Sequence, residues 1–119
     1  MSAKNPAVYL QDIADEIAHL EEFTKPFSNA ADFAAGIEST YACARSIQIM
    51  GDAAKMAPES LRKKYPSIPW KEMSGMRDKI VHDYGNMQLE IVWKTIKEDI
   101  PKAKPFVLEA LKKELAGQK

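Results

Sequence analysis

The chain has 119 residues, the size of one domain, so we expect a single domain over residues 1–119. Its 45% hydrophobic and 29% charged residues exclude a disordered chain, and its apolar stretches are too short to span a bilayer. The 17 basic and 17 acidic side chains cancel, which excludes capture of nucleic acid by total charge.

Glycine is scarce, alternating strand patterns are missing, and apolar residues recur at helical spacing, so we expect an all-α fold. The first predicted helix ends before Pro26, because the residue that precedes a proline avoids helical geometry. Its apolar stripe consists of Leu10, Ile13, Ile17 and Leu20.

Ser28 or Asn29 can cap a second helix, which we predict to continue toward Ala57, where Pro58 stops it. The small residues around Ala44 let another helix approach closely, and this favours a bundle with small crossing angles. The expected apolar side of this helix consists of Phe33, Ile37, Tyr41, Ala44 and Ile47.

A short helix over residues 58–64 and a stiff turn over residues 65–69, which contains two prolines, are expected next. Trp70 then opens a helix that runs to about Tyr84. We predict that residues 85–86, Gly-Asn, end this helix with the left-handed geometry of a C-cap.

The last helical region begins near Gln88. Proline removes a hydrogen-bond donor and clashes with the preceding turn, so Pro101 and Pro105 must bend or break this region. We expect either a bend at Ile100 or a new first turn there. The residues expected to face the core are Leu89, Val92, Ile96, Ile100, Leu108, Leu111 and Leu115.

The most informative stretch is Arg-Asp-Lys-Ile-Val-His-Asp-Tyr over residues 77–84, at the end of the fourth predicted helix. At about 100° per residue, Asp78 and His82 lie one turn apart, and Arg77 and Tyr84 lie two turns apart. Histidine exchanges protons near neutral pH, and arginine makes bidentate contacts with phosphate. Together these side chains could run a phosphodiester transesterification without a metal.

A structural interpretation of the same stretch stays open. A histidine near a helix C-terminus interacts favourably with the helix dipole, and Arg77 with Asp78 can form an ordinary surface ion-pair network. Ile80 and Val81, between the polar positions, are expected to point toward the bundle.

Further motifs favour the functional interpretation. The pattern Arg-x4-His-x-Tyr is preceded by Ile-Pro-Trp at residues 68–70 and Ser-Gly-Met at 74–76, and followed by Val-Trp at 92–93 and Asp-Ile-Pro at 99–101. With these anchors in order, roughly residues 6–115 resemble the HEPN superfamily, and within it the HepT-like toxins of HepT/MntA-type toxin–antitoxin systems. Asp52 follows Gly51 where that family commonly has glutamate, so a role for this shorter carboxylate stays open.

The resemblance implies an up-and-down bundle of about five helices that forms a homodimer, with two motifs facing each other across a cleft. It implies a metal-independent endoribonuclease without a cofactor, in which His82 is the general acid and base, Arg77 stabilises the phosphorane and Asp78 orients one of them. It also implies a partner, a minimal nucleotidyltransferase encoded beside the chain, which transfers AMP to Tyr84. Residues that could line the cleft are Asp52, Arg45 and Lys79.

The charge is unevenly distributed. Residues 1–54 have a net charge of −5, residues 55–79 of +4 and residues 80–119 of +1. The basic run over residues 62–65 is compatible both with a solvated helix end and with binding of an RNA backbone. We therefore expect RNA to bind in the dimer groove, with an affinity that salt weakens.

Several other residues are expected to have structural rather than catalytic roles. Cys43 is expected to be a buried helical residue, and His19, which has no second ligand at metal-binding spacing, is expected at the surface or in packing. Trp70 and Trp93 are expected to anchor the core rather than to stack on bases. One cysteine and an N-terminus without a secretory signal predict a cytoplasmic protein.

Two other functions are compatible with these residues. One is a non-catalytic binding module, which would use the same cleft to dock a nucleotidyltransferase or to bind a nucleotide. The other is a structural dimerisation domain, in which replacing Arg77 and His82 together would have no effect.

Overall fold

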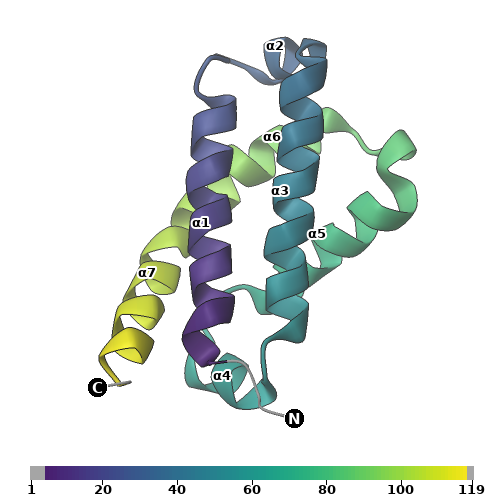
Figure 1. Ribbon diagram of the computed structural model, residues 1–119. Coiled ribbons are helices and arrows are strands. Elements are labelled where there is room, and N and C mark those ends of the chain that lie inside the picture. The colour runs from purple at the N-terminus through teal and green to yellow at the C-terminus, as the bar shows by residue number, and fades with distance from the viewer. Residues whose placement is uncertain (1–4, 118–119) are drawn as a thin grey trace.

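The computed structural model describes residues 5–117, and every regular element in that range is helical (Figure 1). The α-helices are α1 (Pro6–Thr24), α2 (Ala30–Ala35), α3 (Ile37–Met56), α4 (Glu59–Lys64), α5 (Trp70–Asp83), α6 (Leu89–Lys94) and α7 (Ile100–Ala116). A 3-10 turn, η1 (Tyr84–Asn86), follows α5, and a π-helical turn, η2 (Thr95–Asp99), joins α6 to α7. The all-α prediction is confirmed, with more and shorter helices than the five expected.

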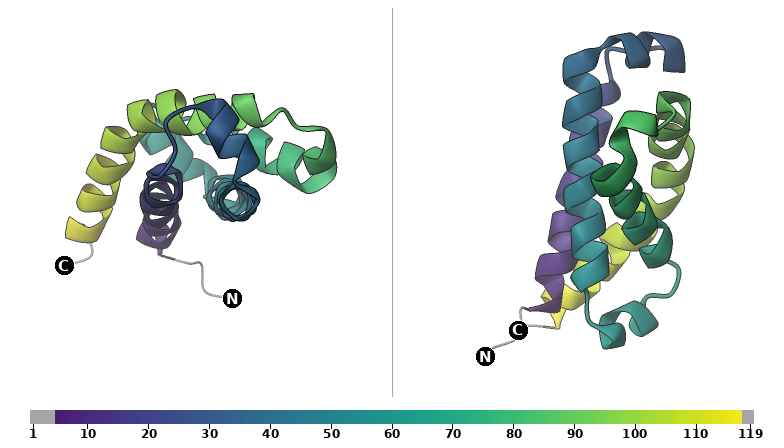
Figure 2. Two further views of the ribbon diagram at one scale, coloured as in Figure 1. Left: turned by 90° about the horizontal axis from the view of Figure 1, so that it is seen from above. Right: turned by 90° about the vertical axis from the view of Figure 1, so that its right-hand side faces the viewer.

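Helix α3 is the centre of the fold. It packs antiparallel to α1 on one side and against α5 on the other, and α7 packs against α1 (Figure 1). Helix α5 and the α6–α7 segment cover one side of the α1–α3 pair (Figure 2). The predicted stripe of α1 and the buried Cys43 of α3 are confirmed as core. The side chains with almost no exposed surface include Leu10, Ile13, Ile17, Leu20, Cys43, Ile47 and Met50.

The predicted second helix is divided in two. Asn29 caps α2 as expected, since its side chain accepts a hydrogen bond from the Asp32 N–H at 2.9 Å. Gly36 then leaves helical geometry, with φ −87° and ψ 81°. A Cβ at this position would lie 2.7 Å from the Phe27 ring, so the glycine lets this ring pack directly against the backbone at the break.

The break changes which face of α3 is buried. Ile37 and Tyr41 were expected in the apolar stripe, but they are 66% and 63% exposed. The stripe instead continues through Cys43, Ile47 and Met50. The prediction of Ile37 and Tyr41 as core residues is therefore wrong, because it assumed one continuous helix from Phe33.

The end of α5 differs from expectation, whereas the start of α7 agrees with it. Helix α5 ends in η1 rather than in a left-handed cap, and no residue from 5 to 117 has a positive φ. A new helix does begin at Ile100, with Pro101 in the first turn, where a missing N–H costs little. Pro105 remains inside α7.

The buried face of α7 differs from the expected one. Within this helix, Leu108 and Leu115 lie about 80° and 60° around the axis from Ile100, on the side away from Ala103, Val107 and Ala110. Leu108 and Leu115 are consequently 45% and 47% exposed, against the prediction, whereas Leu111 is buried as expected. The other buried residues of α7 are Ile100, Ala103, Val107 and Ala110.

Both tryptophans pack against the core, as predicted. Trp70 is buried and donates its indole N–H to the Tyr65 carbonyl oxygen at 2.9 Å. Trp93 is half-buried, with its ring centroid 5.3 Å from that of Phe33. Among the described residues, no helix combines the length and the apolar character that crossing a bilayer requires.

Glu114 ties α7 to the end of α4. Its carboxylate accepts a hydrogen bond from Lys64 Nζ at 2.7 Å and another from the Tyr65 hydroxyl at 2.5 Å. The Lys64 ammonium, with help from the Tyr65 hydroxyl, holds the pKa of the Glu114 carboxyl below its usual value of 4.5. Because the folded state favours the ionised carboxyl, this contact stabilises the fold above pH 4.5 and is lost as pH falls through the lowered pKa.

Replacing Glu114 by glutamine is therefore expected to destabilise the fold by about 1 kcal/mol at pH 7, since one partner is exposed and solvent weakens the ion pair. The difference from the unaltered chain should shrink as pH falls below 4.5 and through the lowered pKa of Glu114, because protonation then removes from the unaltered chain the charge that glutamine lacks. Thermal unfolding from pH 7 to pH 3 measures this. A difference that stays constant over the range would contradict the assigned role of the charge.

Candidate active site

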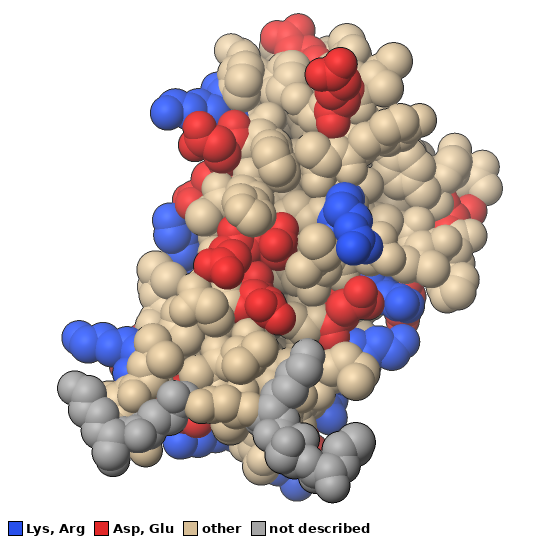
Figure 3. Space-filling model, in the orientation of Figure 1, with Lys and Arg blue, Asp and Glu red and all other residues tan. Residues whose placement is uncertain are grey.

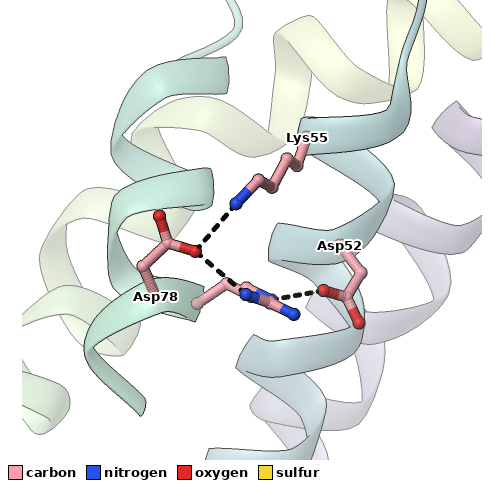
Figure 4. Close-up of polar contacts among 4 residues, drawn as sticks. Asp52, Lys55 and Asp78 are labelled. Carbon is pink, nitrogen blue, oxygen red and sulfur yellow. Dashed lines mark hydrogen bonds and ion pairs between the residues drawn. The ribbon is translucent and has the colours of Figure 1, made fainter. Parts of the chain in front are cut away.

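Arg77 lies between α3 and α5, where two carboxylates hold its guanidinium (Figure 4). Its Nε donates to Asp52 Oδ1 at 2.5 Å, and its Nη1 donates to Asp78 Oδ1 at 3.0 Å. Lys55 Nζ donates to the same Asp78 oxygen at 3.2 Å. The Arg77 side chain is only 23% exposed, so its orientation is fixed by the two helices.

Gly51 explains why this cluster can form. A Cβ at Gly51 would lie 2.2 Å from the Cβ of Arg77 and 2.6 Å from the Met73 carbonyl oxygen. The absence of a side chain therefore allows α3 and α5 to touch at this point. The same close approach brings Asp52, the next residue of α3, within bonding distance of Arg77. The role of the shorter carboxylate, left open by the sequence, is thus a direct contact with Arg77.

The cluster also fixes the charges of its members. Asp52, and then Asp78, raise the already high pKa of the Arg77 guanidinium. Arg77, and then Lys55, hold the pKa of the Asp78 carboxyl below its usual value of 3.8. Asp78 therefore stays ionised near neutral pH and cannot serve as a proton donor there. The sequence left open whether Asp78 orients Arg77 or His82, and in the structure Asp78 contacts Arg77.

His82 lies apart from this cluster. It occupies the last turn of α5 and is exposed. Among residues 5–117, no hydrogen bond or ion pair engages its ring. The fold therefore brings Arg77, Asp78 and Asp52 together but leaves the imidazole of His82 open to solvent, five residues after Arg77 on the same helix.

Tyr84 takes part in a second arrangement, on the other side of the motif. Its ring centroid lies 5.8 Å from that of Tyr41 on α3. The two rings border a surface hollow of about 360 Å³, which Arg45, Gln48, Ala44 and Ile80 also line. Sequence reasoning placed Tyr41 in the core and so missed this pair. The sequence contained one indication of this position. Tyr41 and Gln48 are seven residues apart on α3, so Tyr41 lies on the same helix face as the polar Gln48.

The remaining motif residues divide between core and surface. Ile80 is buried as expected, but Val81 is 42% exposed, so the prediction that Val81 points into the bundle is wrong. Lys79 is exposed, and no hydrogen bond or ion pair joins it to another described residue. His19 is exposed, as expected, and its Nδ1 lies 3.0 Å from Glu16 Oε1. Within the described chain, no three histidine, cysteine or acidic side chains are grouped closely enough to hold a metal ion.

The arrangement offers three chemical groups. The guanidinium of Arg77 is a fixed positive charge suited to phosphate, and the imidazole of His82 is a free acid or base. The third, the phenol of Tyr84, is a nucleophile that lines the same hollow as the Arg45 cation. Within the described residues, no hydrogen bond or ion pair joins any two of these three groups.

Comparisons with known proteins point to one family. The family model described as "Ribonuclease HepT-like" matches residues 13–110. A protein of Thermococcus cleftensis named "Probable ribonuclease HepT" is 42% identical over 96 residues, which are 81% of this chain and 86% of that protein. A protein of Caldanaerobacter subterraneus subsp. tengcongensis, named as a candidate RNase, is 40% identical over 93% of this chain and 98% of its own length.

A third relative comes from Methanocaldococcus jannaschii and is also named as a candidate RNase. It is 35% identical over 107 residues, 90% of this chain and 97% of its own length. No solved structure matches the chain at a significant level.

Proposed function

Because the chain belongs to the HepT-like ribonuclease family, we propose that it is a metal-independent endoribonuclease and the toxin of a toxin–antitoxin pair. In this proposal it cuts RNA through attack of the ribose 2′-OH on the adjacent phosphodiester. The observation that carries the proposal is the presence, on one helix, of a half-buried guanidinium held by two carboxylates and an exposed imidazole that has no hydrogen bond or ion pair with another described residue.

The reaction divides between these two groups. The neutral imidazole of His82 takes the proton from the 2′-OH as the oxygen attacks phosphorus. The Arg77 guanidinium, held by Asp52 and Asp78, stabilises the added negative charge of the phosphorane. The 5′-oxygen then leaves and takes a proton from an imidazolium, so the products are a 2′,3′-cyclic phosphate and a 5′-hydroxyl.

A homodimer would supply the second imidazole and complete the site. Arg77 and His82 are five residues apart on α5, about 140° around the helix, so they face different directions. Exposed apolar side chains flank the motif: Ile37 and Tyr41 on one face of α3, and Val81 on α5. A two-fold interface over these residues would bury them and place two copies of the motif opposite each other.

The direct test is cleavage of RNA by the purified chain in buffer with EDTA. We expect cleavage, since neither imidazole nor guanidinium needs a metal. The competing function is a non-catalytic module that docks a nucleotidyltransferase or binds a nucleotide, and it is favoured by the lack of contact between Arg77 and His82. That alternative predicts a stable complex with the transferase and no cleavage at any concentration of the chain.

Tyr84 is the proposed site at which the partner transfers AMP. The phenol lies beside Arg45 in the surface hollow, where the cation can balance the charge of a new phosphodiester. On co-expression with a nucleotidyltransferase encoded next to this chain, we expect the mass of the peptide that contains Tyr84 to increase by whole AMP units. The increase should be absent from Tyr84→Phe and retained in Tyr65→Phe. Transfer to another tyrosine, or none by an active transferase, would count against this assignment.

A further inference from the structure

A second hollow lies at the other end of α5 from His82. It has a volume of about 660 Å³ and is formed where the ends of α3 and α4 meet the start of α5. Three cations from three helices line it: Lys55 of α3, Arg62 of α4 and Lys71 of α5. The serine hydroxyls of residues 67 and 74 also line it, with one carboxylate, that of residue 72. We call this hollow the basic pocket.

The charge of the basic pocket is available to a ligand. In the basic run 62–64, Lys63 pairs with Glu59 at 3.1 Å and Lys64 pairs with Glu114 at 2.7 Å. Neither Arg62 nor Lys71 has an ion pair or hydrogen bond with another described residue. Of the basic run 62–64, only Arg62 is therefore without an ion pair among the described residues. Lys71, from a different helix, is the second such cation in the pocket.

The basic pocket is continuous with the Arg77 cluster. Lys55 lines the pocket and also donates to Asp78, which in turn accepts from Arg77 (Figure 4). On α5, Lys71, Ser74 and Asp78 follow one another at spacings of three and four, so they form one stripe. This stripe leads from the pocket to the cluster over about 10 Å of helix axis.

The face formed by α1 and α3 is unfavourable for a polyanion. On this face, acidic side chains gather in the middle and basic ones lie mostly toward the edges (Figure 3). Residues 1–54, which include α1 and most of α3, carry the net charge of −5. An RNA strand that reaches the motif is therefore expected to approach along α5 and to avoid the α1–α3 face.

We propose that the basic pocket binds backbone phosphates of single-stranded RNA and so positions the strand that the motif cuts, an inference that rests on the proposed function. Lysine, arginine and serine are residues that contact phosphate oxygens. The one tryptophan at the pocket, Trp70, is buried and bonded to the Tyr65 carbonyl, so it offers no face for stacking a base. The pocket should consequently bind RNA without a sequence preference.

The test uses the His82→Ala chain, in which RNA stays intact, and measures its binding to a labelled single-stranded RNA by fluorescence anisotropy. Adding Arg62→Gln and Lys71→Gln is expected to raise Kd roughly tenfold at about 100 mM salt. It should also reduce the slope of log Kd against log salt by about 1.4, since each lost phosphate contact contributes about 0.7. Two RNAs of unrelated sequence should lose affinity equally.

The matched control is Lys94→Gln with Lys112→Gln, which removes the same charge from two exposed residues outside the pocket. This control should change Kd less than twofold. Equal weakening by both pairs, or loss of affinity for one RNA sequence only, would overturn the assignment of the basic pocket. So would an unchanged Kd.

The binding test and the proposed function can fail separately. If the Arg62 and Lys71 substitutions leave Kd unchanged while the chain with His82 cuts RNA, the pocket is refuted and the ribonuclease stands. If the unaltered chain never cuts RNA, the ribonuclease is refuted, while the anisotropy result still decides whether the pocket binds RNA.

Discussion

Replacing His82 by alanine is expected to reduce RNA cleavage by about 10²- to 10⁴-fold, the usual contribution of a general acid or base. The side chain is exposed and has no hydrogen bond or ion pair among the described residues, so stability should change by less than about 0.5 kcal/mol. The measurements are the initial rate of cleavage in EDTA and the midpoint of thermal unfolding. A loss of activity without a loss of stability separates a catalytic role from a structural one.

The chain contains a natural control, because it has two histidines. His19 is also exposed, but it lies on α1 beside Glu16 and away from the motif. Cleavage by His19→Ala should stay within about twofold of the unaltered chain, within the small effects usual for a surface substitution. Full activity of His82→Ala, or an equal loss in both variants, would exclude His82 as the catalytic base.

Replacing Gly51 by alanine is expected to have the largest effect on stability. The added Cβ would overlap Arg77 and the Met73 carbonyl oxygen, and a carbonyl of the backbone cannot move aside as a flexible side chain can. Overpacking of this kind costs typically 1–3 kcal/mol, and we expect about 3 kcal/mol here, measured by denaturant unfolding. Because the contact also sets the distance from Asp52 to Arg77, cleavage by the folded fraction should fall as well.

Gly75→Ala is the matched control for this prediction. Gly75 lies in the middle of α5, and a Cβ there would meet no atom within 4 Å. Alanine is the better helix former by roughly 1 kcal/mol, so this variant should be more stable than the unaltered chain. The same substitution thus has opposite effects at two positions. A Gly51→Ala chain as stable as Gly75→Ala would show that α3 and α5 do not depend on this contact.

Much of the fold could be predicted because the determining signals are local. Apolar spacing identified α1, and the prolines before α4 and α5 marked their starts. The break at Gly36 was not predicted, because a single glycine inside an apolar helical pattern does not by itself mark a break, and its contact with the Phe27 ring is seen only in the fold. The π-helical turn before Ile100 was also missed, because nothing in a local pattern distinguishes five residues of wider helix from five of ordinary helix.

In the candidate site, too, local features could be predicted and contacts between distant residues could not. The motif on α5 could be identified because all its residues lie within eight positions. The contacts of Arg77 with Asp52 and of Asp78 with Lys55 join residues 25 and 23 positions apart, so they follow only from how α3 meets α5. Gly51 was a signal for that meeting, because a buried glycine inside a long helix usually marks a close approach.

The two carboxylates around Arg77 affect how strongly the chain would stabilise a transition state relative to a bound substrate. They hold the guanidinium in one orientation before a substrate binds, so this side chain need not be ordered as negative charge develops on the phosphate. A phosphorane, which carries more negative charge on its oxygens than a phosphodiester does, gains more from the same guanidinium. The arrangement thus favours the transition state over the bound substrate, and differential stabilisation of this kind raises the rate of a bound complex rather than its affinity.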